Sequence, residues 1–247
     1  MSRLGFSDTK KMRASFPPNE IRWGGAGLAL GAVLYMIAIV LFVAVYGQPE
    51  GTGPGGRLVL ADTAAHMRER WSLVHGLWCT EMMGALLIGI AAFALQRRRP
   101  TGFPLLPASV AWIAVGVGAS ILTVMYAFTL GSYPPALAAF QEQAAVFAAL
   151  RGGMASLFYI GMAVMFFGLA GAFVAEMSAA KRILPRWVAF VGAAVTVLVT
   201  IRWVAMFAGI LGGLTASSAP LGLVAFLLTG VFGLSILRGA PQDNTPG

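Results

Sequence analysis

The chain has 247 residues, of which 58% are hydrophobic and only 11% are charged, and its mean hydropathy is +0.81. A soluble domain carries about 25% charged residues, so this composition excludes a soluble globular protein and predicts a polytopic membrane protein. The net charge of +8 requires no nucleic-acid partner, because topology and attraction to anionic lipid account for it. We therefore predict that the lipid bilayer is the main partner of this protein and contacts most of its surface.

Six apolar runs are long enough to cross a bilayer core, which takes about 20 helical residues. Each run is continuous, whereas the strands of a membrane barrel alternate apolar and polar residues. We therefore predict an all-α bundle of six transmembrane helices, with spans at residues 24–46, 72–95, 107–129, 154–176, 188–211 and 221–237. The transmembrane domain covers residues 24–238, between a basic tail (1–23) and a tail expected to be disordered (239–247).

The basic residues predict the orientation of these spans. On one side of the membrane lie twelve of them: Arg3, Lys10, Lys11, Arg13, Arg22, Arg97, Arg98, Arg99, Lys181, Arg182, Arg186 and Arg238. On the other side lie four: Arg57, Arg68, Arg70 and Arg151. Because cytoplasmic loops are enriched in Lys and Arg, both termini are predicted to be cytoplasmic.

Two segments on the outer side are expected to contain helix. The first outer loop ends in a predicted short helix over residues 58–70. The second outer segment, residues 132–153, carries Pro134-Pro135 at an expected helix start, followed by strongly helix-forming residues 136–150. We expect this helix to lie along the outer surface or to extend the fourth span outward.

Small residues recur at spacings that let helix backbones approach closely. Gly27 and Gly31 lie in the first span, and Gly161, Gly168 and Gly171 lie in the fourth. Such glycines pack helices within a bundle or between copies of a chain. Packing within the bundle is the leading interpretation, and a homo-oligomer is the alternative.

Glu81 and Arg202 are charged residues inside apolar runs. A charge at the bilayer centre costs about 3 kcal/mol on insertion scales, so such residues are normally paired or hydrated. Both lie nine residues from the outer end of a predicted span, which is roughly 14 Å deep at 1.5 Å per residue. The leading interpretation is a Glu81–Arg202 ion pair that sets helix register. The alternatives are a proton or anion site and no contact between them.

A second candidate site lies on one face of the second span. His75, Cys79, Met82 and Met83 follow one another at helical spacing. Imidazole, thiolate and thioether groups suit Cu(I) or another soft metal, although Met and Cys are also ordinary packing residues. No second ligand cluster accompanies them, and the only other histidine, His66, lies in the outer loop. We therefore predict no metal and no cofactor, and keep a pigment or metal on His75 as an alternative.

Two stretches stand next to predicted spans: Arg182-Ile183-Leu184-Pro185-Arg186-Trp187 before the fifth and Ala148-Ala149-Leu150-Arg151 before the fourth. With them the chain resembles a bacterial family of six-span membrane proteins known only by a domain of unknown function. The similarity extends over most of the chain. It implies a six-helix arrangement and a multi-pass location in the bacterial inner membrane, and it brings no activity and no catalytic residues.

Three classes of function follow from these patterns. The chain carries no recognisable catalytic motif, and we therefore predict a protein that is not an enzyme. The leading prediction is an accessory or structural subunit of a membrane complex, because the spans carry few polar residues. The first alternative is a small transporter or ligand-binding protein that uses Glu81 and Arg202. The second is a cofactor- or metal-binding protein that uses His75.

Overall fold

The computed structural model describes residues 18–46, 60–96, 108–179, 182–210 and 219–239. These residues form seven α-helices and one π-helical segment, η2. In chain order they are α1 (Pro18–Leu41), η2 (Phe42–Tyr46), α2 (Leu60–Glu69), α3 (Trp71–Leu95), α4 (Ala108–Ala138), α5 (Ala144–Ser178), α6 (Arg186–Phe207) and α7 (Ala219–Gly239). The predicted terminal tails lie largely outside the described residues, as does the Gly- and Pro-rich part of the first outer loop.

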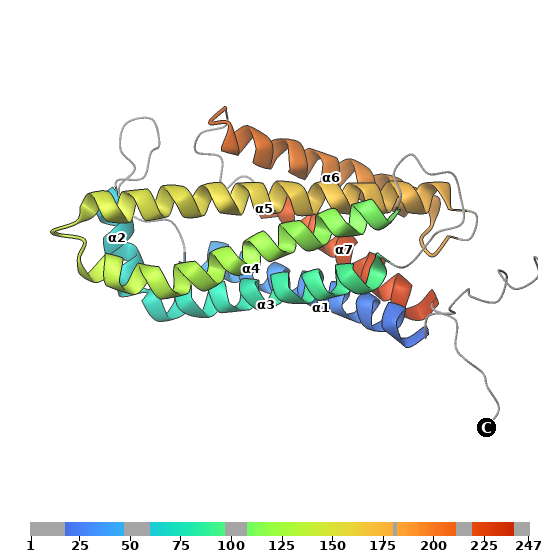
Figure 1. Ribbon diagram of the computed structural model, residues 1–247, viewed down its shortest axis with the longest axis horizontal. Helices are drawn as coiled ribbons and strands as arrows, with labels where there is room; N and C mark the ends of the chain where they lie inside the picture. The colour runs from blue at the N-terminus through green and yellow to red at the C-terminus, as the bar shows by residue number, and fades with distance from the viewer. Residues whose placement is uncertain (1–17, 47–59, 97–107, 180–181, 211–218, 240–247) are drawn as a thin grey trace, which may run out of the picture.

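Six of these helices are long and apolar enough to cross a membrane, which confirms the predicted six-span helical bundle. Figure 1 shows the six long helices running along the long axis of the molecule, while the short α2 crosses them at one end. We call this end the α2 end. It corresponds to the side predicted to face outward, and the cytoplasmic location of the termini stays a prediction.

The second outer segment differs from one of its two expected arrangements. Pro134 and Pro135 do not begin a helix, because they lie inside the last turns of α4. Both rings are exposed at the end of the helix, where the carbonyl groups that lose an N–H partner can be hydrated. A turn follows α4, and α5 begins at Ala144. The fourth span therefore extends outward, and no separate surface helix forms there.

The six long helices close into a ring. Along the ring, the order of neighbours is α1, α3, α4, α5, α6 and α7, and α7 returns to α1. The contact between α6 and α7 is the sparsest of the six. This order places α3 and α6 on opposite sides of the ring. Glu81 of α3 and Arg202 of α6 therefore do not lie on neighbouring helices.

Glycines bring three pairs of neighbouring helices into backbone contact. A Cβ at Gly31 of α1 would lie 2.7 Å from the Gly84 carbonyl oxygen of α3. A Cβ at Gly168 of α5 would lie 2.6 Å from the Ala111 carbonyl oxygen of α4. Gly233 of α7 approaches the backbone of α1 in the same way. The glycine spacing in the sequence therefore marks packing within the bundle, and a homo-oligomer stays a prediction.

Basic residues in α2 and immediately after it contact the ends of neighbouring helices. Arg70 donates hydrogen bonds to the carbonyl oxygens of Val45 (2.7 Å) and Tyr46 (2.8 Å). His66 Nε2 lies 2.9 Å from the same Tyr46 oxygen, and Arg68 donates to the Leu137 carbonyl near the end of α4. The last carbonyls of a helix lack partners within it and carry partial negative charge. These side chains therefore hold the end of η2 and the end of α4 beside α2.

Candidate functional site

A cavity of about 480 Å³ lies inside the ring at the α2 end. Its wall is mostly apolar, and it is rich in aromatic rings: Phe42, Trp78, Tyr126, Tyr133, Phe158, Tyr159, Phe166, Trp203 and Phe226. Four methionines add flexible, polarizable surface: Met67, Met125, Met154 and Met162. A volume of about 300–1,000 Å³ with a few polar groups is typical of small-molecule sites.

The deep part of the cavity holds a carboxyl group beside two tyrosine hydroxyls. Glu81 and Tyr126 line the wall, and Tyr35 lies behind them, stacked on Phe226 with ring centroids 4.5 Å apart. The three polar groups interact electrostatically. Tyr126 is 2% exposed and Tyr35 is 0% exposed, and neither hydroxyl has a partner at hydrogen-bonding geometry among the described residues.

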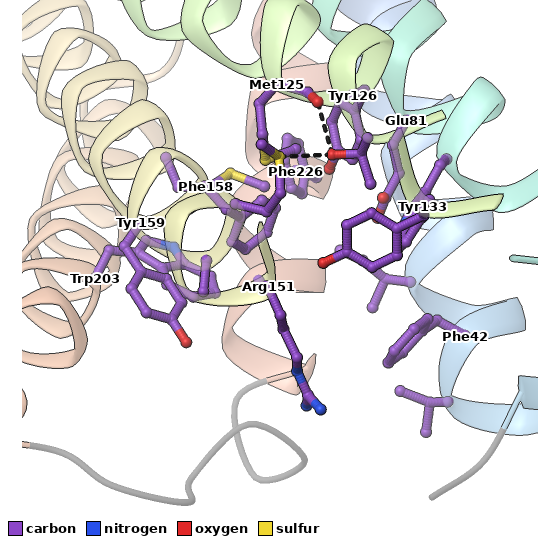
Figure 2. A pocket seen from close by; sticks show the side chains of 18 of the residues that line it. Phe42, Glu81, Met125, Tyr126, Tyr133, Arg151, Phe158, Tyr159, Trp203 and Phe226 are labelled. Atoms are coloured by element: carbon purple, nitrogen blue, oxygen red, sulfur yellow. Dashed lines mark hydrogen bonds between the residues drawn. The ribbon is translucent and has the colours of Figure 1, made fainter. Parts of the chain in front are cut away.

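The helices position these groups through their regular spacing. Tyr126, Thr129 and Tyr133 follow one another at i, i+3 and i+7 on α4, so they share one face, and all three line the cavity. Thr129 is internally satisfied, because its hydroxyl donates to the Met125 carbonyl oxygen (2.7 Å) and lies 2.8 Å from Met154 Sδ (Figure 2). We call Tyr126, Thr129 and Tyr133 the polar stripe of α4. Within it, the Tyr126 hydroxyl is the group in the deep part of the cavity that can hydrogen-bond to a ligand.

A positive charge lies at the other end of the cavity. Arg151 lines the wall from the first turns of α5. Its charge acts on the hydroxyls of Tyr133 and Tyr46. Figure 2 shows its side chain extending away from Glu81 and Tyr126. Among the described residues, the guanidinium group forms no ion pair with a carboxylate. The cavity thus has a carboxyl group at one end and a guanidinium group at the other.

Glu81 and Arg202 do not form the predicted ion pair. Glu81 lines the cavity from α3. Arg202 lies in α6, with its guanidinium 5.7 Å from the ring centroid of Trp203 and Nη2 3.9 Å from Met206 Sδ. The two helices face each other across the ring and are not neighbours.

The depth of Arg202 also differs from the expected 14 Å, whereas the depth of Glu81 agrees with it. Because α6 ends at Phe207, Arg202 is only about 8 Å from the end of its helix. Glu81 is about 15 Å from the start of α3 at Trp71. Trp203, the residue after Arg202, does contribute to the site, because it lines the cavity and stacks on Tyr159 with ring centroids 5.7 Å apart.

The four side chains of the candidate ligand face on α3 do not converge on one point. His75 Nδ1 and Cys79 Sγ lie 3.8 Å apart. Met82 packs against the core, whereas Met83 is 45% exposed on the outside of the bundle. Within the described ranges, no three His, Cys, Asp or Glu residues are grouped so that they could hold a metal ion. None of the four lines the cavity.

Sequence reasoning missed two charged residues that the fold uses. Arg151 belongs to an outer segment whose helix was expected either to lie along the surface or to extend the fourth span outward, and nothing in the sequence indicates that it lines a cavity. Glu176 is 1% exposed at the other end of α5, and its Oε2 accepts a hydrogen bond from the Ile183 backbone N–H at 3.1 Å. The polar stripe on α4 was the available signal for the cavity.

Comparisons with family models, curated proteins and solved structures gave no match to this chain. The candidate site therefore stands on its geometry. The chain is a multi-pass helical membrane protein by the length and composition of its six long helices.

Proposed function

We propose that this protein binds a predominantly apolar small molecule in the cavity at the α2 end, through an oxygen of the ligand that contacts Glu81 and Tyr126. The observation that carries the proposal is the Tyr126 hydroxyl, which is buried at the cavity wall next to Glu81 and has no partner at hydrogen-bonding geometry among the described residues. A buried polar group without a partner costs about 1–3 kcal/mol. A hydroxyl or carbonyl oxygen of a ligand removes this cost.

The surroundings favour an apolar ligand body. Aromatic and methionine side chains form most of the wall, and they supply contact area without requiring hydrogen bonds from the ligand. A ligand of this kind partitions into the bilayer, so it meets the protein at high local concentration. The cavity is therefore suited to a lipid-soluble molecule with one hydrogen-bonding end.

Binding fits this geometry better than transport or catalysis. Beyond Glu81 the ring is filled by buried side chains, among them Ile88, Trp112, Phe173 and Phe232. Trp112 and Phe173 both contact the Phe232 ring, with centroids 5.8 and 4.9 Å away. A transport path would require this packed half to open. The accessory subunit of a membrane complex stays a prediction. It is compatible with the proposed binding function, because such a subunit could itself bind the ligand.

Filling the cavity is expected to abolish binding. Gly222 lines the cavity, and a Cβ there meets only Ile39 Cδ1, at an ordinary 3.8 Å. Gly222→Phe should therefore place a ring in the cavity without disrupting helix packing. The probe is 12-bromododecan-1-ol, whose bromine quenches tryptophan fluorescence at contact, since Trp78 and Trp203 line the wall. We expect saturable quenching of the wild type in nanodiscs and a loss of affinity of at least about tenfold in the variant.

The matched control is Gly76→Phe. Gly76 is exposed on α3, and a Cβ there meets nothing within 4 Å. This variant adds the same ring outside the cavity and should quench as the wild type does. Equal quenching of the wild type and Gly222→Phe would show that the alcohol binds elsewhere and would reject the proposed site.

A further inference from the structure

We infer that the ligand is a single-chain amphiphile with an anionic group, a carboxylate or phosphate, held by Arg151 at the mouth of the cavity. The inference rests on the proposed binding function and adds the chemistry of the ligand's other end, which is an anionic group. In this account the apolar chain runs inward from Arg151, and a hydroxyl or carbonyl oxygen reaches Glu81 and Tyr126.

The three arginines that the structure describes at the α2 end differ in what they contact. Arg68 and Arg70 donate to the carbonyl oxygens that end α4 and η2. Arg151 lines the cavity instead, and the groups its charge acts on are the tyrosine hydroxyls of Tyr133 and Tyr46. Arg68 and Arg70 therefore stabilise helix ends, whereas Arg151 presents its charge to the cavity. A guanidinium group binds carboxylate and phosphate through two parallel hydrogen bonds.

The two charged residues of the cavity fix the direction of the ligand. Tyr126 beside Glu81 and Tyr133 near Arg151 are seven residues apart on α4, which is a rise of about 10 Å. An anion at the deep end would meet a carboxyl group and no cation lining that part of the wall among the described residues. An anion at the mouth meets Arg151. The anionic end is therefore outermost, as a lipid headgroup is.

The size of the cavity favours a ligand with a single hydrocarbon chain. Its 480 Å³ is within the range of small-molecule sites. Arg151 belongs to the first turns of α5 beside the α2 end, where the water-facing edge of a bilayer is expected. A free long-chain acid or a phosphorylated single-chain alcohol has the required chemistry. A two-chain phospholipid of the surrounding bilayer is the competing source of the same headgroup.

The test compares 10-hydroxydecanoate with decan-1-ol as competitors of 12-bromododecan-1-ol in zwitterionic phosphatidylcholine nanodiscs. Both competitors carry the hydroxyl for Glu81 and Tyr126, and only the first carries an anion. We expect the acid to compete at least about tenfold more strongly in the wild type, as one charge-assisted hydrogen bond would provide. Arg151→Gln should make the two competitors equal, and Arg151→Lys should leave an intermediate preference.

Arg68→Gln is the matched control, because it removes the same charge from the α2 end at a residue outside the cavity wall. It should keep the preference for the acid. The inference is overturned if the wild type shows no preference, if Arg151→Gln keeps it, or if Arg68→Gln removes it to the same extent. Displacement of the probe by phosphatidylglycerol added to the bilayer would assign the site to a two-chain lipid instead. Absence of saturable quenching by the bromoalcohol itself rejects the proposed function and not only its anionic end.

Discussion

Gly118→Ala is expected to destabilise the folded bundle by about 2 kcal/mol, because the added Cβ has no space. Gly118 of α4 faces α5, and a Cβ built on it would lie 2.6 Å from the Gly161 carbonyl oxygen and against the Met165 backbone nitrogen. These are backbone atoms of the neighbouring helix, so they cannot move aside as a flexible side chain does. The helices must separate, and their surrounding contacts weaken. Unfolding in mixed micelles with increasing sodium dodecyl sulfate measures the change.

Gly131→Ala on the same helix is the control for this prediction. A Cβ at Gly131 meets nothing within 4 Å, so only the helix propensity changes, and it favours alanine by up to about 1 kcal/mol. The two variants should therefore move stability in opposite directions. Equal stabilities would mean that α4 and α5 are not packed through Gly118 and would contradict the helix arrangement.

Glu81→Leu is expected to stabilise the protein without ligand while it weakens ligand binding. A charged side chain inside the membrane costs about 3 kcal/mol on insertion scales, so an apolar side chain of similar volume removes this cost. The same change removes a hydrogen-bonding partner of the ligand, so the affinity for 12-bromododecan-1-ol should fall by about tenfold. The opposite signs distinguish a binding residue from a structural one, whose loss would lower both quantities.

Met83→Leu provides the comparison for Glu81→Leu. Met83 lies two residues further along α3 and is 45% exposed on the outside of the bundle, so this variant should change neither stability nor affinity appreciably. Thermal unfolding with and without the bromoalcohol gives both readings in one experiment. A Glu81→Leu protein that is less stable and binds as the wild type does would assign Glu81 to the scaffold.

Hydropathy alone predicts the six helices, because each run must satisfy its backbone within the segment. The spacing of Gly161 and Gly168 likewise predicts the close approach of α5 to a neighbour, since small residues let helix backbones come together. These features depend on local sequence. The sequence also allows α5 to extend beyond a bilayer-length span, but it does not indicate that Arg151 on this extension lines a cavity, because that depends on the neighbouring helices.

The failure of the Glu81–Arg202 pair has a different cause. Depth along a helix can be estimated from the sequence, but which helices are neighbours cannot, and the ring places α3 opposite α6. The cavity is a property of the same ring. It forms where residues from α1, α3, α4, α5, α6 and α7 meet, and only the polar stripe of Tyr126, Thr129 and Tyr133 marks it within a single helix.

The anomalous signal of bromine in a crystal structure with 12-bromododecan-1-ol tests the central claim most directly. The account predicts one bromine peak inside the cavity, on the Arg151 side of Glu81, with the alcohol oxygen within hydrogen-bonding distance of Tyr126. Bromine peaks confined to the lipid-facing surface, with the aromatic wall of the cavity closed on itself, would contradict the assignment of this cavity as a binding site.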